Sequence, residues 1–386
     1  MVILFTLIKG ANIYAPQNIG KMNILIASGK IAYIGSEYKA FTGIQGIEIY
    51  EAEGLIAFPG IIDGHVHISG GGGEGGFATR TVETGIDDFA ANGTTTVVGI
   101  LGTDCVCRSL EILYAKAKML ETQGITTFMY TGSYRVPAVT LTGDVQKDLI
   151  LIDKVVGVGE IAISDHRSSQ PSKKELSRLC ADARVGGMLS GKAGIVHFHV
   201  GDHIDGLKPI MQVFRETSLP ITQFYPTHVN RNAALFKQAM DFVKMGGYID
   251  LTAGIEPQNP ADDCIPAYKA LKILLDSGAD DNNITITSDG NGSASSLDSN
   301  GEIKKVNPIS CGVLLNDLKK AVTELKVPLE KALKTVTANP ARILKLESKG
   351  NIKEGMDGDI VISDEKLNIN TVFAKGKKIY QQSQVP

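Results

Sequence analysis

The stretch LIAFPGIIDGHVHISGGGGEGGF, residues 55–77, decides how the rest of the chain is interpreted. Its apolar first half is typical of a strand that is buried on both faces. His65 and His67 follow two residues apart, and alternate residues of a strand share a face. Two imidazoles at one strand end can bind a metal ion, although an isolated pair is as often structural. The four glycines and Glu74 that come next indicate either backbone that approaches a ligand closely or a surface loop.

The composition is that of an ordinary globular protein. The chain has 386 residues, 43% hydrophobic, with a net charge of −3. This length is typical of a barrel with one additional small domain. The slightly negative net charge does not favour binding of nucleic acid. No apolar run reaches the roughly 20 residues that span a bilayer, and the N-terminus is expected to be a strand of the mature protein, not an export signal. Five unevenly spaced cysteines favour reduced thiols and a cytoplasmic location, with Cys105 and Cys107 as free thiols or, less expectedly, metal ligands.

The pattern along the chain predicts two domains. Residues 1–55 and 345–386 alternate short apolar runs with turns, which indicates a small β-sandwich domain built from both termini. Residues 56–344 alternate strand and helix patterns eight times, which is the order of a (β/α)8 TIM barrel. The helical pattern is least clear between the third and fourth strands. A doubly wound open sheet is the alternative fold.

Chemically active side chains collect at the predicted strand ends, where such barrels carry their active sites. All seven histidines of the chain are among them, so a purely structural role for the whole set is not expected. In strand order these residues are His65, His67 and Glu74 after the first strand; Tyr134 after the third; Glu160, Asp165, His166 and Arg167 on the fourth; His197, His199, Asp202 and His203 on the fifth; His228 and Arg231 on the sixth; and Ser288, Asp289 and Ser293 on the eighth.

These ligand types predict metal-assisted hydrolysis. Imidazoles and carboxylates from several strands can hold one or two divalent metal ions, with zinc the leading candidate. Water bound to such a metal loses a proton near neutral pH and becomes a nucleophile. Asp289 can take that proton and pass it to a leaving amine. The predicted substrate is therefore an amide or an ester.

The same residues resemble the amidohydrolase superfamily. His65 and His67 on the first strand, His199 on the fifth, His228 on the sixth and Asp289 on the eighth match its metal-binding pattern, and the segment from NPARILKL to DGDIVISD is similar to its closing stretch. Within the superfamily the chain resembles the isoaspartyl dipeptidase family over nearly its full length. The matching pieces are HVHISGGGGEGGF, TGSYRVP, AISDHRSS, FHVGD, PTHVNR and SDGNGS.

This resemblance implies a peptidase that hydrolyses β-aspartyl dipeptides by means of a metal-activated hydroxide. It also implies a homo-oligomer such as an octamer. The resemblance implies that His65 and His67 hold one metal ion, that His199 and His228 hold the other, and that Asp289 completes the first site and carries the proton. It implies that Tyr134 polarises the scissile carbonyl. It also implies that Glu74 binds the substrate's α-amino group and that its carboxylates are bound by Arg167, Arg231 and Ser293. Two arginines and one acid beside a metal pair also suit a small zwitterion with an extra carboxylate.

One position departs from the family pattern. The family's bridging ligand on the fourth strand is a carboxylated lysine, whereas this chain has Glu160. Both groups end in a two-oxygen anion, but glutamate is shorter. We hypothesise that Glu160 bridges two zinc ions directly and that carbon dioxide is not needed; the alternative is a site with a single metal ion.

Other functions and roles remain open from the sequence. A cyclic amidase or an N-acyl amino acid hydrolase of the superfamily would share the metal ligands, but is not expected to share Glu74 and the pair of arginines, Arg167 and Arg231. A non-catalytic binding protein on the same fold is the second alternative. His197 is expected to pack in the core and not to bind metal, and His166 and His203 are expected to be loop residues.

Overall fold

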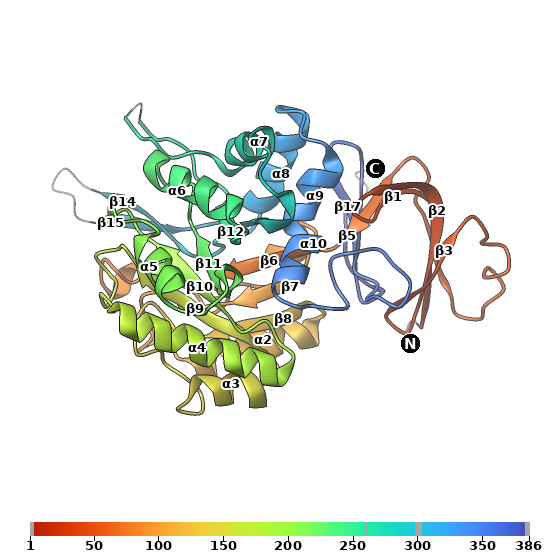
Figure 1. Cartoon of the computed structure of the whole chain (residues 1–386). Coiled ribbons are helices and arrows are strands. Elements are labelled where there is room, and N and C mark those ends of the chain that lie inside the picture. The colour runs from red at the N-terminus through yellow and green to blue at the C-terminus, as the bar shows by residue number, and fades with distance from the viewer. Residues whose placement is uncertain (1–3, 260, 298–302, 383–386) are drawn as a thin grey trace.

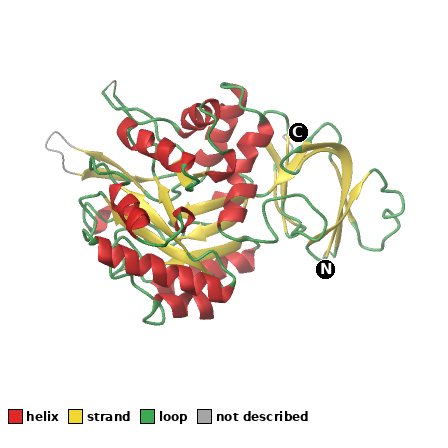
Figure 2. Ribbon diagram, viewed as in Figure 1, coloured by secondary structure: helices red, strands yellow, loops and turns green. Residues whose placement is uncertain are grey.

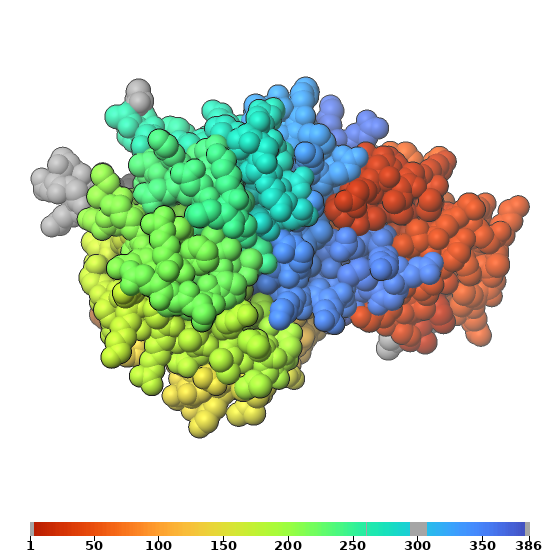
Figure 3. Space-filling view, viewed as in Figure 1, coloured from red at the N-terminus to blue at the C-terminus, as the bar shows by residue number. Residues whose placement is uncertain are grey.

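The computed structural model describes residues 4–259, 261–297 and 303–382. The chain forms a strand-rich part from its two ends and a larger part of strands and helices from its middle (Figures 1 and 2). In Figure 3 the red N-terminal atoms and the blue C-terminal atoms lie against each other at one end of the molecule. Strands from the two ends of the chain pair in one sheet.

The apolar run 55–62 forms two strands, not the single strand expected. β5 (Ile56–Pro59) belongs to the terminal sheet, and β6 (Ile61–Val66) begins the parallel sheet of the middle part. Gly60 lies between them, and a Cβ at this position would lie only 2.1 Å from the hydroxyl of Thr95. The chain can cross between the sheets here because glycine has no side chain. The terminal sheet thus includes four residues that the predicted boundary assigns to the barrel.

The terminal part is one continuous mixed sheet. Its order is β18-β17-β16-β5-β1-β2-β3, with β4 also paired to β1. Its hydrogen bonds join one sheet, whereas a sandwich would have two separate packed layers. A bulge at Lys9 and Gly10, opposite Asn23, allows the long strands to bend. The strands besides β5 are β1 (Phe5–Tyr14), β2 (Asn18–Ala27), β3 (Lys30–Gly35), β4 (Glu48–Glu51), β16 (Ile360–Ser363), β17 (Ile369–Ala374) and β18 (Lys377–Gln381).

The middle part contains the eight predicted strands in the predicted order. Six pair in parallel in the order β11-β10-β9-β8-β7-β6, and β12 pairs in parallel with β13. The two groups meet at both edges: Val229 N donates to Asp250 O at 3.5 Å, and His67 N donates to Gly290 O at 2.9 Å. The strands after β6 are β7 (Thr94–Gly99), β8 (Thr126–Thr131), β9 (Val155–Ile163), β10 (Ile195–Val200), β11 (Phe224–Thr227), β12 (Ile249–Thr252) and β13 (Ile284–Thr287), followed by the hairpin β14 (Ser293–Leu297) and β15 (Ile303–Pro308).

Helices cover the outer side of these strands (Figure 2). Ser172 and Glu175 make a capping box at the N-terminus of α4. No helix in the described ranges is both long and apolar enough to cross a membrane. The helices are α1 (Asp87–Ala90), α2 (Leu110–Gln123), α3 (Val145–Leu151), α4 (Lys173–Ser190), α5 (Lys208–Glu216), α6 (Ala233–Lys244), α7 (Ala267–Asp276), α8 (Val313–Thr323), α9 (Leu329–Val336) and α10 (Ala338–Ile343).

The helix expected after the first barrel strand is reduced to the four residues of α1. The threonines before α1 bind the glycine loop instead. The Thr81 hydroxyl donates to Gly71 O and accepts from Gly71 N at 3.1 and 2.7 Å, and the Thr84 hydroxyl donates to Ile68 O at 3.2 Å. These side chain–backbone bonds compete with helix formation and hold the glycine loop beside the strand ends.

Candidate active site

Polar side chains from five segments meet at the carboxyl ends of the parallel strands. His65 lies on β6, Glu160 on β9 and His199 on β10, while His228 and Asp289 lie just beyond β11 and β13. His65 and Glu160 are fully buried, and the two other imidazoles are nearly so. His228 and Asp289 both adopt a positive φ, which turns each side chain at the strand end. Far-apart segments of the sequence thus converge on one centre, as predicted.

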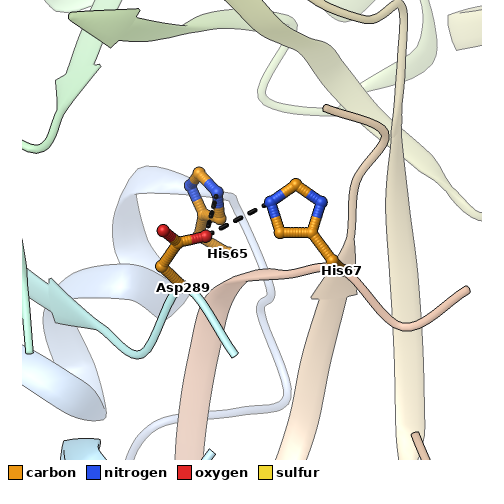
Figure 4. A group of neighbouring side chains, drawn as sticks. All are labelled: His65, His67 and Asp289. Atoms are coloured by element: carbon orange, nitrogen blue, oxygen red, sulfur yellow. Dashed lines mark ion pairs between the residues drawn. The ribbon is translucent and has the colours of Figure 1, made fainter. Parts of the chain in front are cut away.

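The first cluster is formed by His65, His67 and Asp289 (Figure 4). Oδ1 of Asp289 lies 3.4 Å from Nε2 of His65 and 3.2 Å from Nε2 of His67. These are the three residues expected to hold one metal ion. Their ligand atoms come from two segments of the chain, the end of β6 and the residues just after β13.

The second cluster is formed by His65, Glu160 and His228. Oε2 of Glu160 lies 3.3 Å from His65 Nε2 and 3.0 Å from His228 Nε2. His199 Nδ1 lies 3.3 Å from the same oxygen, beside this cluster and in contact with the Tyr134 hydroxyl at 2.9 Å. The grouping differs from the expected one because His65 contributes to both clusters.

The donor set fits divalent metal ions. Nε2 of His65, Oε1 of Glu160 and Oδ1 of Asp289 are buried without a hydrogen-bond partner among the described residues. Buried polar atoms are normally paired, so unpaired nitrogen and oxygen atoms that face one another are suited to hold a cation. Imidazole nitrogen and carboxylate oxygen are ligands that zinc accepts.

In two of the imidazoles, the ring nitrogen that faces away from Glu160 contacts a second polar group. Nε2 of His199 lies 2.8 Å from Oδ2 of Asp165. Because a carboxylate accepts, Nε2 carries the proton, and the lone pair of Nδ1 faces Glu160. Nδ1 of His228 lies 2.7 Å from the Thr252 hydroxyl, which leaves Nε2 toward Glu160. Such partners orient metal-binding histidines and fix their tautomers.

The charges of the clusters control the protonation of their members. Burial lowers the pKa of His65, but the carboxylates of Glu160 and Asp289 outweigh it and raise that pKa to about 9. Burial raises the pKa of Glu160, but His65 and His199 outweigh it and hold that pKa well below its usual range. Burial lowers the pKa of His228 to about 3. In the metal-free centre these pKa values keep His65 protonated and His228 neutral at neutral pH.

We expect zinc binding at pH 7 to release the proton of His65, because a nitrogen that binds metal must lose its proton. The pKa of His65, about 9, keeps this imidazole charged in the metal-free protein, whereas His228 is already neutral. Isothermal titration calorimetry in buffers of different ionisation enthalpy measures the number of protons released. This number should decrease as the pH is raised through 9, and a number that does not change there would contradict the assignment to His65.

A cavity of about 600 Å³ opens over the clusters and contains the predicted substrate-binding residues. Arg167 donates to Asp165 through Nε and Nη2 at 2.9 and 2.7 Å, and its Nη1 lies 3.7 Å from Oε1 of Glu74. Oε2 of Glu74 is buried and lacks a partner in the described part of the chain. The other residues at the cavity wall include His67, Tyr134, His199, Arg231, Asp289 and Ser293.

Comparisons with known proteins agree with this site. The sequence model described as the amidohydrolase family matches residues 56–379. The chain belongs to the amidohydrolase family. A crystal structure of the β-aspartyl dipeptidase of Fervidobacterium islandicum AW-1 in complex with β-Asp-Leu is 45% identical, covers 100% of this chain and 99% of that one, and superposes with a TM-score of 0.92.

Proteins with lower sequence identity also match this chain. Dihydropyrimidinase from Brevibacillus agri is 16% identical over 98% of this chain and 95% of that one, with a TM-score of 0.69. A dihydroorotase from Lactobacillus johnsonii is 22% identical over 98% of this chain and 96% of its own length. The dihydroorotase of Acetivibrio thermocellus is 28% identical, but the match spans only 45% of this chain and 38% of that one.

The remaining sequence candidates separate into two groups. His166 and His203 are loop residues with side chains 90% and 61% exposed. Asp165 lies between His199 and Arg167 and contacts both, a role that its position at a strand end does not indicate. Thr252 contacts Nδ1 of His228. The sequence does not predict this contact, because threonines are common in buried strands. In this amidohydrolase the predicted ligands are thus accompanied by partners that only the folded chain reveals.

Proposed function

We propose that the protein is a metal-dependent dipeptidase that hydrolyses β-aspartyl (isoaspartyl) dipeptides. The observation that supports this most is a single cavity whose wall combines His67, His199 and Asp289 of the candidate metal centre with Glu74, one of whose carboxylate oxygens is unpartnered, and with the cations Arg167 and Arg231. A β-aspartyl dipeptide carries one ammonium group and two carboxylates. The charges of the cavity are complementary to those three groups.

The proposed cofactor is a pair of zinc ions per chain. His65, His67 and Asp289 would hold one ion, His199 and His228 the other, and Glu160 would bridge them in place of the family's carboxylated lysine. Support comes from Oε1 and Oε2 of Glu160, one unpartnered and the other shared by three imidazoles. When bound, such ions lower the pKa of a water molecule and polarise a carbonyl group.

Asp289 and Tyr134 are the proposed catalytic residues. Burial raises the pKa of Asp289, but bonds to His65 and His67 outweigh it and keep this group a carboxylate at neutral pH. Asp289 can therefore accept a proton from the attacking water and give it to the leaving amine. Burial and the nearby Glu160 raise the pKa of Tyr134 well above its usual value, so the phenol keeps its proton and donates a hydrogen bond to the oxygen of the scissile carbonyl.

Charged side chains position the substrate before bond cleavage. Glu74 binds the α-amino group, and Arg167, Arg231 and Ser293 bind the two carboxylates. Asp165 holds the guanidinium of Arg167 in a two-point contact, which presents the remaining Nη1 to the cavity. A planar guanidinium in a fixed orientation selects a carboxylate more strongly than a mobile ammonium does.

We expect Arg167→Lys to raise KM for the dipeptide about 10- to 100-fold, since a charge-assisted bond and its fixed geometry are lost. The bound metal should be unchanged. Steady-state kinetics with β-Asp-Leu measures this effect, and Arg178→Lys on the exposed face of α4 is the matched control. An unchanged KM would mean that Arg167 contacts Asp165 but does not bind the substrate.

The test of function compares β-Asp-Leu with α-Asp-Leu and with dihydroorotate, each with added zinc. We expect hydrolysis of the β-linked peptide alone. The similarity to dihydroorotases over most of the chain makes a cyclic amidase, or another hydrolase such as an N-acyl amino acid hydrolase, the second candidate. Turnover of dihydroorotate alone would support the cyclic amidase, and no turnover of any substrate would support a binding protein.

We also propose the domain organisation, the cellular location and the oligomeric state of this enzyme. The eight parallel strands, which begin with β6, would form a closed (β/α)8 barrel that ends near residue 344. Residues 1–55 and 345–386, together with β5, would form the terminal β domain. All five cysteines are free, which is consistent with a reducing cytoplasm. The family resemblance supports a homo-oligomer such as an octamer, and light scattering of the purified protein measures the number of subunits.

A further inference from the structure

His197 is a fully buried histidine that belongs to neither cluster. It lies on β10, two residues before His199. Its ring stacks on Tyr130 with centroids 5.2 Å apart and an interplanar angle of 17°, and it lies against Tyr225 at 4.6 Å and 38°. Each of its two nitrogens faces a polar atom, so the ring is fixed by packing and by hydrogen bonds together.

The partners of His197 determine where the protons lie. Its Nδ1 is 2.9 Å from the carbonyl oxygen of Tyr225, which can only accept, so Nδ1 carries a proton. In a neutral imidazole the other nitrogen is then an acceptor. That nitrogen, Nε2, lies 2.9 Å from Nδ1 of His65, which must donate to it. The remaining nitrogen of His65, Nε2, faces Glu160 and Asp289.

We propose that His197 is a positioning residue that selects the tautomer and the ring orientation of the metal ligand His65. This inference rests on the metal site proposed above. His65 is the one residue that the two clusters share, so its orientation affects both. The carbonyl of Tyr225 fixes His197, His197 accepts from Nδ1 of His65, and the lone pair of His65 Nε2 is thereby directed at the metal position.

A simple packing role makes a different prediction. Phenylalanine at position 197 retains an aromatic ring between Tyr130 and Tyr225 but has no nitrogen. Glutamine at the same position loses the ring, but its amide oxygen can reach the place of Nε2 and accept from Nδ1 of His65. The two variants therefore separate packing from hydrogen bonding.

The binding test measures cobalt(II) affinity by competition with a chelator, for the full-length protein and for His197→Phe and His197→Gln. We expect His197→Phe to bind cobalt about 10- to 100-fold more weakly, as loss of such a supporting partner usually does, and His197→Gln to stay within a few-fold of the parent. Parent affinity in His197→Phe would overturn the inference, and so would equal losses in both variants. A parent protein that binds no cobalt would instead overturn the proposed metal site, and this inference with it.

A spectroscopic test needs no folded phenylalanine variant. Long-range ¹H–¹⁵N correlation spectra of the zinc-loaded parent protein report which nitrogen of each histidine carries the proton. The signals of His197 are those that vanish in His197→Gln. We expect the Nδ1–H tautomer for both His197 and His65. An Nε2–H tautomer at either residue, or a doubly protonated His197, would overturn the inference.

Discussion

Tyr134→Phe is expected to lower kcat for β-Asp-Leu about 10²- to 10³-fold, the usual cost of removing one donor to a developing oxyanion. The hydroxyl of Tyr134 lies at the wall of the cavity, 2.9 Å from Nδ1 of His199. Its raised pKa means that it acts as a proton-bearing donor at neutral pH. Phenylalanine keeps the ring and its packing on His199 and removes only the hydroxyl. Steady-state kinetics and metal analysis of the same preparation are the measurements.

Tyr130→Phe is the matched control for this experiment. Tyr130 is also a buried tyrosine, on β8 itself, but its hydroxyl has no hydrogen-bond partner in the ranges that the structure describes. The control should keep the turnover of the parent protein. Tyr134→Phe should keep its full metal content, so loss of metal in this variant would show that the hydroxyl supports the ligands and not the substrate.

Glu160→Gln is expected to have the second large effect, a fall in activity of at least about 10³-fold together with loss of bound metal. Three imidazole nitrogens lie within 3.3 Å of Oε2 of Glu160. The neutral amide of glutamine removes the negative charge that offsets two cations and offers one oxygen in place of two. Metal analysis after dialysis and β-Asp-Leu hydrolysis measure both losses.

Asp317→Asn is the control for removal of a buried negative charge. Asp317 is buried on α8 and accepts from the backbone N of Gly254 at 3.2 Å, outside the cavity. It should retain metal and activity. Glu160→Gln with unchanged metal content would remove the argument that Glu160 is a ligand. Retention of one ion with most of the activity would favour a single-metal site.

The sequence predicts the order of strands in this fold well because apolar runs and glycine turns are local signals. It fails where tertiary contacts decide. The run 55–62 is uniformly apolar, and nothing in its pattern indicates that Gly60 divides it between two sheets, since the close contact with Thr95 arises only in the folded chain. The helical pattern before α1 is lost for a similar reason, because Thr81 bonds to Gly71.

The candidate site shows the same division. Ligand-type residues at strand ends could be found from spacing and from family resemblance, since each lies beside a recognisable strand. Their partners could not, because a bond such as that between His228 and Thr252 joins residues 24 apart on neighbouring strands. The sharing of His65 by both clusters is likewise a property of three-dimensional distance. The SDHR segment offered one usable signal, an acid two residues before Arg167, for the role of Asp165.

Titration of the metal-free protein with zinc, followed by β-Asp-Leu hydrolysis, tests most directly whether these residues form a two-metal hydrolytic centre. We expect activity to rise with added zinc and to saturate at two equivalents per chain, in buffers with or without bicarbonate. Full activity at one equivalent, or full activity in the metal-free protein, would rule out a two-metal centre.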